Sequence, residues 1–167
     1  MAVYSIDRLM AEARRLAAEY RRTTGKTLPV SGEIAVYDAI RLLGLEPAPA
    51  GTAGYDAVRV QQGQRQRVQV KGRVVFDDSK GGHRIGQLRA GQQWDLVVLV
   101  LMDDRYEAME IHAATRAAVL GVLEQGAGRG RAHKGALSVA RFRNIGRLVW
   151  SRELGTEDDG YWSNAPS

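Results

Sequence analysis

The stretch GYDAVRVQQGQRQRVQVKGRVV, residues 54–75, decides the fold. Apolar and polar residues alternate on either side of Gln62-Gly63, a pair suited to a tight turn, so the stretch predicts a β-hairpin within residues 55–76. A turn at that pair sets Asp56 directly opposite Gln69 on the neighbouring strand. The hairpin therefore brings a carboxylate next to an amide oxygen.

The two faces of this hairpin differ in chemistry. Side chains alternate along a strand, so Lys71 shares a face with Gln69. The opposite face is apolar and suited to a core: Tyr55, Ala57, Val68 and Val70. A carboxylate, an amide oxygen and an ammonium group on the polar face suit a hard divalent cation beside a phosphate. An ordinary half-buried antiparallel strand alternates in the same way, and this simpler interpretation stays open at this point.

Length and composition favour one globular domain. The chain has 167 residues, of which 44% are hydrophobic and 26% are charged. It contains no cysteine, which excludes disulfides and thiolate zinc sites. The N-terminus lacks the basic start and apolar run of a signal peptide, and the longest apolar run, Leu96–Met102, is too short to span a bilayer. We therefore expect a cytoplasmic protein.

The net charge of +5 is unevenly distributed along the chain. Residues 59–75 hold five cations and no acid, and residues 129–147 hold six cations and no acid. Residues 151–167 are instead rich in acids, and we expect them to form a flexible acidic tail. Segregated basic stretches predict a polyanion partner, in the first place nucleic acid. The alternative is a solvated basic surface, inflated by a preference for arginine over lysine, 20 against 4.

The order of the remaining elements predicts the architecture. Helical periodicity predicts helices on either side of the hairpin in sequence. The unbroken apolar run Leu96–Met102 is typical of a strand buried on both faces. The expected helices cover residues 5–22, 32–43 (with Ser31 as N-cap) and 114–124, and the further strands cover residues 96–102, 106–112 and 147–150. A single α/β domain over residues 1–150 follows, with a central mixed β-sheet flanked by helices.

Three short motifs in this order resemble the PD-(D/E)xK superfamily, which has the restriction-endonuclease-like fold. They are Glu33 in Ser-Gly-Glu-Ile-Ala, Asp56 in Gly-Tyr-Asp-Ala, and Gln69-Val70-Lys71. The Gln-x-Lys form is similar to the catalytic domains of type IV restriction endonucleases. A helix acid with Asp and x-Lys is also similar to archaeal Holliday-junction resolvases. The resemblance covers residues 31 to about 112, and it implies a nuclease domain.

The resemblance implies a site for Mg²⁺ or Mn²⁺. Asp56 would anchor the metal, with Gln69 Oε1 and the Val70 carbonyl as further ligands. Glu33 would ligate the metal directly or through water. Lys71 would hold the attacking water and offset charge on the phosphate. Most active members carry a carboxylate at position 69, so the neutral Gln69 lowers the charge of the site and weakens Mg²⁺ binding.

Cations and polar groups around this core are candidates for binding nucleic acid, mainly through phosphates. Some follow the strand of Lys71, where families of this kind place phosphate contacts, and others lie in or after the Gly/Arg-rich segment 126–135. The candidates are Arg73, Arg84, Gln87, Arg129, Arg131, Lys134, Arg141 and Arg143.

The sequence thus predicts a metal-dependent DNA endonuclease acting on double-stranded or branched DNA, in restriction, phage defence or DNA repair. One site per chain requires a homodimer to cut both strands. Two alternatives stay open. The same fold can bind nucleic acid without hydrolysing it, or the basic surface can bind an acidic protein.

Overall fold

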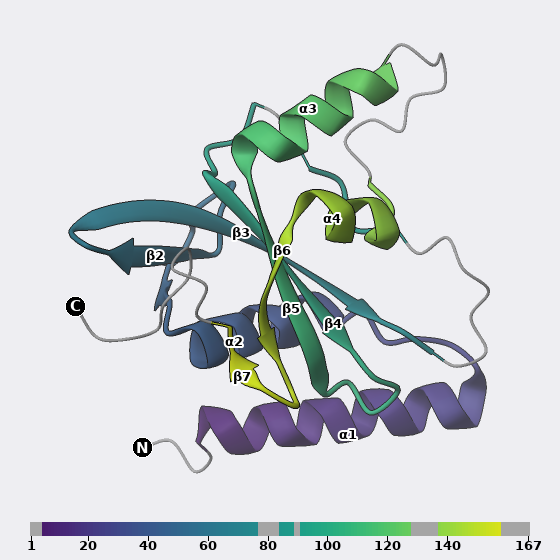
Figure 1. Ribbon diagram of the computed structural model, residues 1–167. Coiled ribbons are helices and arrows are strands. Elements are labelled where there is room, and N and C mark those ends of the chain that lie inside the picture. Colours follow the sequence, from purple (N-terminus) through teal and green to yellow (C-terminus); the bar gives the residue numbers. More distant parts are fainter. Residues whose placement is uncertain (1–4, 77–83, 89–90, 128–136, 158–167) are drawn as a thin grey trace.

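A seven-stranded mixed β-sheet forms the centre of the chain (Figure 1). The computed structural model describes residues 5–76, 84–88, 91–127 and 137–157. Within them the strands lie in the sheet in chain order, and all neighbours are antiparallel except β3 and β4. The strands are β1 (Glu46–Pro47), β2 (Ala57–Gln61), β3 (Gln64–Val74), β4 (Leu96–Met102), β5 (Ala108–Thr115), β6 (Arg147–Ser151) and β7 (Gly155–Thr156).

Helices cover both faces of this sheet (Figure 1). The helices of the described residues are α1 (Ile6–Thr24), α2 (Ser31–Leu43), α3 (Arg116–Ala127) and α4 (Val139–Ile145). The first two pack on one face and the last two on the other, which confirms the predicted α/β domain with a central mixed sheet. No helix in the described parts of the chain is long and apolar enough to cross a lipid bilayer.

β4 separates two hydrophobic cores. Its seven residues are all buried, and they alternate between the core under α1 and α2 and the core under α3 and α4. Val98 and Val100 belong to the first core, whereas Val97 and Leu99 belong to the second. An apolar run without alternation is what a strand buried on both faces requires.

The predicted hairpin forms with the predicted register. Ala57 pairs with Val68, and the turn residues Gln62 and Gly63 both adopt left-handed backbone conformations, with φ of 51° and 77°. Two successive positive φ values define the tight turn that matches the twist of a hairpin. β3 is longer than β2, and beyond Val68 its partner in the sheet is β4. This leaves one edge of β3 open to side chains.

The structure corrects three local expectations. α2 begins at Ser31 itself, and its N-cap is Val30, which makes no side-chain capping bond. Tyr55 packs against the core under α3 and α4 rather than beside Ala57, because it precedes β2 and follows Gly54, whose φ of 95° turns the chain. The sheet also extends into the segment expected to be a tail, since β7 pairs with β6. Residues 158–167 lie outside the described residues.

α1 is anchored to the rest of the fold by a buried ion pair. The guanidinium of Arg14 donates to both carboxylate oxygens of Asp38 on α2, and its Nη1 also donates to the carbonyl oxygen of Tyr106 at 2.6 Å. Both side chains are almost inaccessible to solvent. The pair is therefore satisfied on both sides, and it fixes the position of α1 against α2 and the turn between β4 and β5.

Candidate functional site

Asp56 lies immediately before the start of β2, where the edge of β3 opens. Its backbone remains in the sheet: the N–H donates to Val68 O at 2.8 Å, and the carbonyl accepts from Ala48 N at 3.0 Å. Its carboxylate then takes the place of a strand partner, since Oδ2 accepts from Val70 N at 2.8 Å. The carbonyl of a strand residue points to the same side as its N–H, so Val70 O faces Asp56 as well. The predicted pairing of Asp56 with this part of β3 is present.

Gln69 presents a buried acceptor at the same place. The residue is 8% exposed, and its Nε2 donates to Gln92 Oε1 at 3.4 Å. Among the described residues, Gln69 Oε1 is the one buried side-chain polar atom without a hydrogen-bond partner. An unpaired buried acceptor destabilises the fold by about 1–3 kcal/mol, so a hydrogen-bond donor or a cation bound to Gln69 Oε1 would be stabilising.

Lys71 lies on the same face of β3, half-buried beneath the segment 84–88. Its Nζ donates to the carbonyl of Gln87 at 3.1 Å, and a Cβ placed on Gly86 would lie 3.3 Å from Nζ. Burial lowers the pKa of Lys71, and the negative charge of Asp56 opposes that shift. The lysine is thus held close to the carboxylate by its hydrogen bond to Gln87 O, and Gly86 leaves room for its Nζ.

The loop that reaches Gln69 is held in place by residues that the sequence did not mark as functional. Arg116, at the start of α3, donates to the carbonyl oxygens of Gln92 at 3.0 Å and Trp94 at 2.7 Å, which holds the loop that reaches Gln69. Asp95 accepts from the backbone and guanidinium of Arg67, and the guanidinium hydrogen bonds hold the pKa of that carboxyl below its usual value. Nothing in the local pattern marks Gln92 as a neighbour of Gln69, because the two meet only through the parallel pairing of β3 with β4.

Glu33 is not brought into contact with this group. The first turn of α2 packs on β3, since a Cβ built on Gly72 would lie 2.5 Å from Ala35 Cβ and 2.9 Å from Ser31 O. Residues 31 and 35 lie one turn apart on the face toward the strand, so position 33 lies on the opposite side of the helix. Glu33 is exposed and makes no hydrogen bond or ion pair with the described residues. The phase of α2, which the sequence left open, decides this placement.

The remaining donor set suits a weakly held hard cation. Asp56, Gln69 Oε1 and Val70 O are all oxygen ligands on one edge, and the unpaired Gln69 oxygen is the observation that fits a cation there. The described residues contain no cluster of three or more His, Asp or Glu side chains able to hold a metal. A metal at this edge would therefore rely on one carboxylate, neutral oxygens and water.

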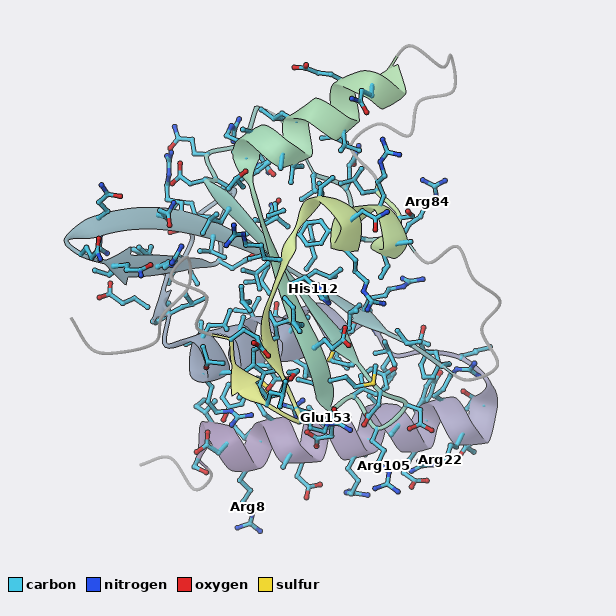
Figure 2. The ribbon with its side chains drawn as sticks, in the orientation of Figure 1. Arg8, Arg22, Arg84, Arg105, His112 and Glu153 are labelled. Carbon is cyan, nitrogen blue, oxygen red and sulfur yellow. The ribbon has the colours of Figure 1, made fainter. Side chains whose placement is uncertain are left out.

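The candidates for binding nucleic acid divide into four groups. Arg73 is exposed and shares the face of Lys71, and Arg84 is exposed beside the start of α4, where it bridges to Ser138 (Figure 2). Two candidates on α4 are engaged, since Arg141 donates to Gln125 Oε1 at 3.1 Å and Arg143 lies 3.4 Å from Glu110 Oε2. Gln87 contributes its backbone carbonyl to Lys71. The others lie outside the described residues: Arg129, Arg131 and Lys134.

Comparisons of the sequence with known proteins add no identification. No protein-family model matches the chain, and no curated protein matches it significantly.

Proposed function

We propose that this protein is a metal-dependent DNA endonuclease of the PD-(D/E)xK type. The observation that carries the proposal is the unpaired, buried Gln69 Oε1, which lies on the strand edge that also presents the Asp56 carboxylate. Two residues further along β3, Lys71 is half-buried, and the negative charge of Asp56 acts on its pKa. A carboxylate, a neutral oxygen and a desolvated ammonium group are the parts that metal-assisted phosphodiester hydrolysis uses.

Three residues of the site would bind the metal, and Lys71 would act on the water and the phosphate. Asp56, Gln69 and the Val70 carbonyl would hold Mg²⁺ or Mn²⁺, which when bound supplies a more acidic water and neutralises phosphate charge. One N–H of the Lys71 ammonium is used by Gln87 O, and its other two remain to orient a water and to donate to a phosphate oxygen. Because the ammonium is partly desolvated, its hydrogen bonds to a developing negative charge are stronger than they would be in water.

The same proposal includes the setting of the reaction. Double-stranded or branched DNA is the substrate, the exposed cations Arg73 and Arg84 contact phosphates beside the site, and a homodimer cuts both strands. Restriction, phage defence or DNA repair, in the cytoplasm, is the biological context that such an activity fits.

A second candidate function is a nucleic-acid-binding module without hydrolysis. It is favoured by the single carboxylate of the site, because Glu33 points away and Gln69 is neutral. In this case the basic face would still hold nucleic acid with steep salt dependence, and metal would have no effect on it.

Cleavage of supercoiled plasmid distinguishes the two functions. We expect nicking and linearisation in Mg²⁺ or Mn²⁺, none in EDTA, and a loss of about 100-fold or more in Asp56→Asn and Lys71→Met. Asp104→Asn and Lys26→Met make the same chemical changes at exposed positions and should cleave like the wild type. Plasmid that is retained but not cut, equally in all five proteins, would reject the endonuclease and favour the binding module.

A further inference from the structure

α1 exposes a row of apolar side chains to solvent. Ile6 is 60% exposed, Leu9 47%, Leu16 53% and Tyr20 37%. Four of the six large apolar side chains that the described residues leave exposed therefore lie on this helix. The partly exposed Ala13 completes the row, which we name the α1 stripe. A contiguous apolar strip of this kind on a folded protein marks an interaction surface more often than an accident of composition.

The spacing of the α1 stripe is that of a helix-pairing surface. Its residues follow one another at alternating steps of three and four, which are the a and d positions of a heptad repeat. The helix does not need these side chains for its own fold, because a different face, with Arg14, Ala17 and Ala18 buried, packs on the rest of the domain. α1 thus has two packing faces, and the described residues supply a partner for only one of them (Figure 1).

We propose that the α1 stripe is a homodimer interface in which α1 helices of two copies pack antiparallel, about a two-fold axis at Ala13. The stripe is self-complementary in that orientation, because its large residues are arranged almost symmetrically around position 13. Ile6 would lie opposite Tyr20 of the second copy, and Leu9 would lie within one residue of the level of Leu16. The small side chain at the axis lets the two helices approach closely.

The charges beside the α1 stripe select the antiparallel orientation. Glu12 and Glu19 border the stripe, each bonded to an arginine three residues later in its own helix, and Arg8 extends from α1 away from the domain (Figure 2). With the axis at Ala13, antiparallel pairing brings Glu19 within one residue of the level of Arg8 of the second copy, and Glu12 within one residue of the level of Arg15. Parallel pairing in register would instead set every charge level with its own like charge, and would align the two helix dipoles.

The size of the stripe sets the expected strength of the dimer. From Ile6 to Tyr20 it spans about 21 Å at 1.5 Å per residue. One helix of this length covers less than the roughly 800 Å² per partner of a standard stable interface. The dimer should therefore dissociate on dilution, and Leu9 and Leu16, next to the axis, should carry most of its apolar contact.

The proposal deepens the proposed function, whose double-strand cut needs two copies, but it is derived from α1 alone. Because the chain has no cysteine, single cysteine substitutions report the orientation directly. Ala13→Cys should form a disulfide-linked dimer under mild oxidation. Ile6→Cys should not, since it lies opposite Tyr20, and neither should Leu154→Cys, a 75% exposed position outside α1. Efficient linkage through Ile6→Cys, or none through Ala13→Cys, would overturn the antiparallel interface.

Sedimentation over a wide concentration range gives the second test. We expect a reversible dimer for the wild type and for Leu154→Glu, and a monomer with an unchanged melting temperature for Leu16→Glu. A monomeric wild type would mean that another partner covers the stripe, and it would refute the proposal, as would a dimeric Leu16→Glu. In the plasmid assay, Leu16→Glu should still nick but no longer linearise. If the wild type dimerises without cutting, the endonuclease fails and the interface stands.

Discussion

Gly72→Ala tests how closely α2 is packed against the strand that carries the site. The added Cβ would lie 2.5 Å from Ala35 Cβ, 2.9 Å from Ser31 O and 3.2 Å from Met102 Cε. Carbon atoms prefer separations of about 3.5–4.0 Å, so α2 and β3 must move apart by roughly 1 Å. The Met102 methyl group can move aside, but the two closer atoms belong to helix α2 and neither is the end of a flexible side chain.

The cost follows from that geometry. Forcing a methyl group into a packed contact destabilises a protein by about 1–3 kcal/mol. For a chain of this length each kcal/mol lowers the melting temperature by roughly 2–4 °C, so Gly72→Ala should lower it by about 2–12 °C. Thermal unfolding followed by circular dichroism measures this shift.

Gly32→Ala is the matched control, on the helix α2 that packs against Gly72. A Cβ at position 32 would meet nothing within 4 Å, and alanine favours the helix over glycine by up to about 1 kcal/mol. The two identical substitutions should therefore change stability in opposite directions. A melting temperature of Gly72→Ala equal to or above that of the wild type would refute the described packing of α2 on β3.

Three further predictions concern buried charges. Asp38→Ala leaves the charged side chain of Arg14 buried without its partner. The substitution should lower the free energy of unfolding, measured with guanidinium chloride as denaturant, by about 3–5 kcal/mol. Burial lowers the pKa of Lys71, so its charged form destabilises the fold below that pKa, and stability recovers as the pH rises toward the usual value of 10.5. Lys71→Met should accordingly raise the urea midpoint at pH 7, with a smaller gain at pH 10. Burial also lowers the pKa of His112, although the hydrogen bond to Glu110 opposes this shift. The free energy of unfolding should therefore fall as the pH drops from 6.5 toward the lowered pKa. In urea titrations at pH 7 and pH 5, His112→Gln should lose less stability between the two pH values than the wild type.

The hairpin was predictable because its information is local. The turn at Gln62-Gly63 and the alternation on either side of it fix the register, and the register alone places Asp56 beside the segment of Gln69 and Lys71. The sheet around it was predictable for a similar reason. An unbroken apolar run requires cover on both faces, which only helices above and below the sheet provide.

The rest of the site depends on contacts that no local pattern records. Gln92 and Gln87 lie in the connection between β3 and β4, and they meet Gln69 and Lys71 only because these two strands pair in parallel. The direction of Glu33 depends on the rotation of α2 about its axis, which is set by the packing of that helix on Gly72. A motif can name the residues of such a site, but the phase of a neighbouring helix decides which of them meet.

The thermal stability of Gln69→Glu with and without Mn²⁺ tests the metal site most directly. A carboxylate at this buried position should lower the melting temperature in EDTA, because its charge has no partner. Mn²⁺ should restore the loss and stabilise Gln69→Glu more than the wild type, while Asp56→Asn should no longer respond to the metal. If Mn²⁺ leaves all three melting temperatures unchanged, this edge of β3 does not bind a cation and the endonuclease account is contradicted.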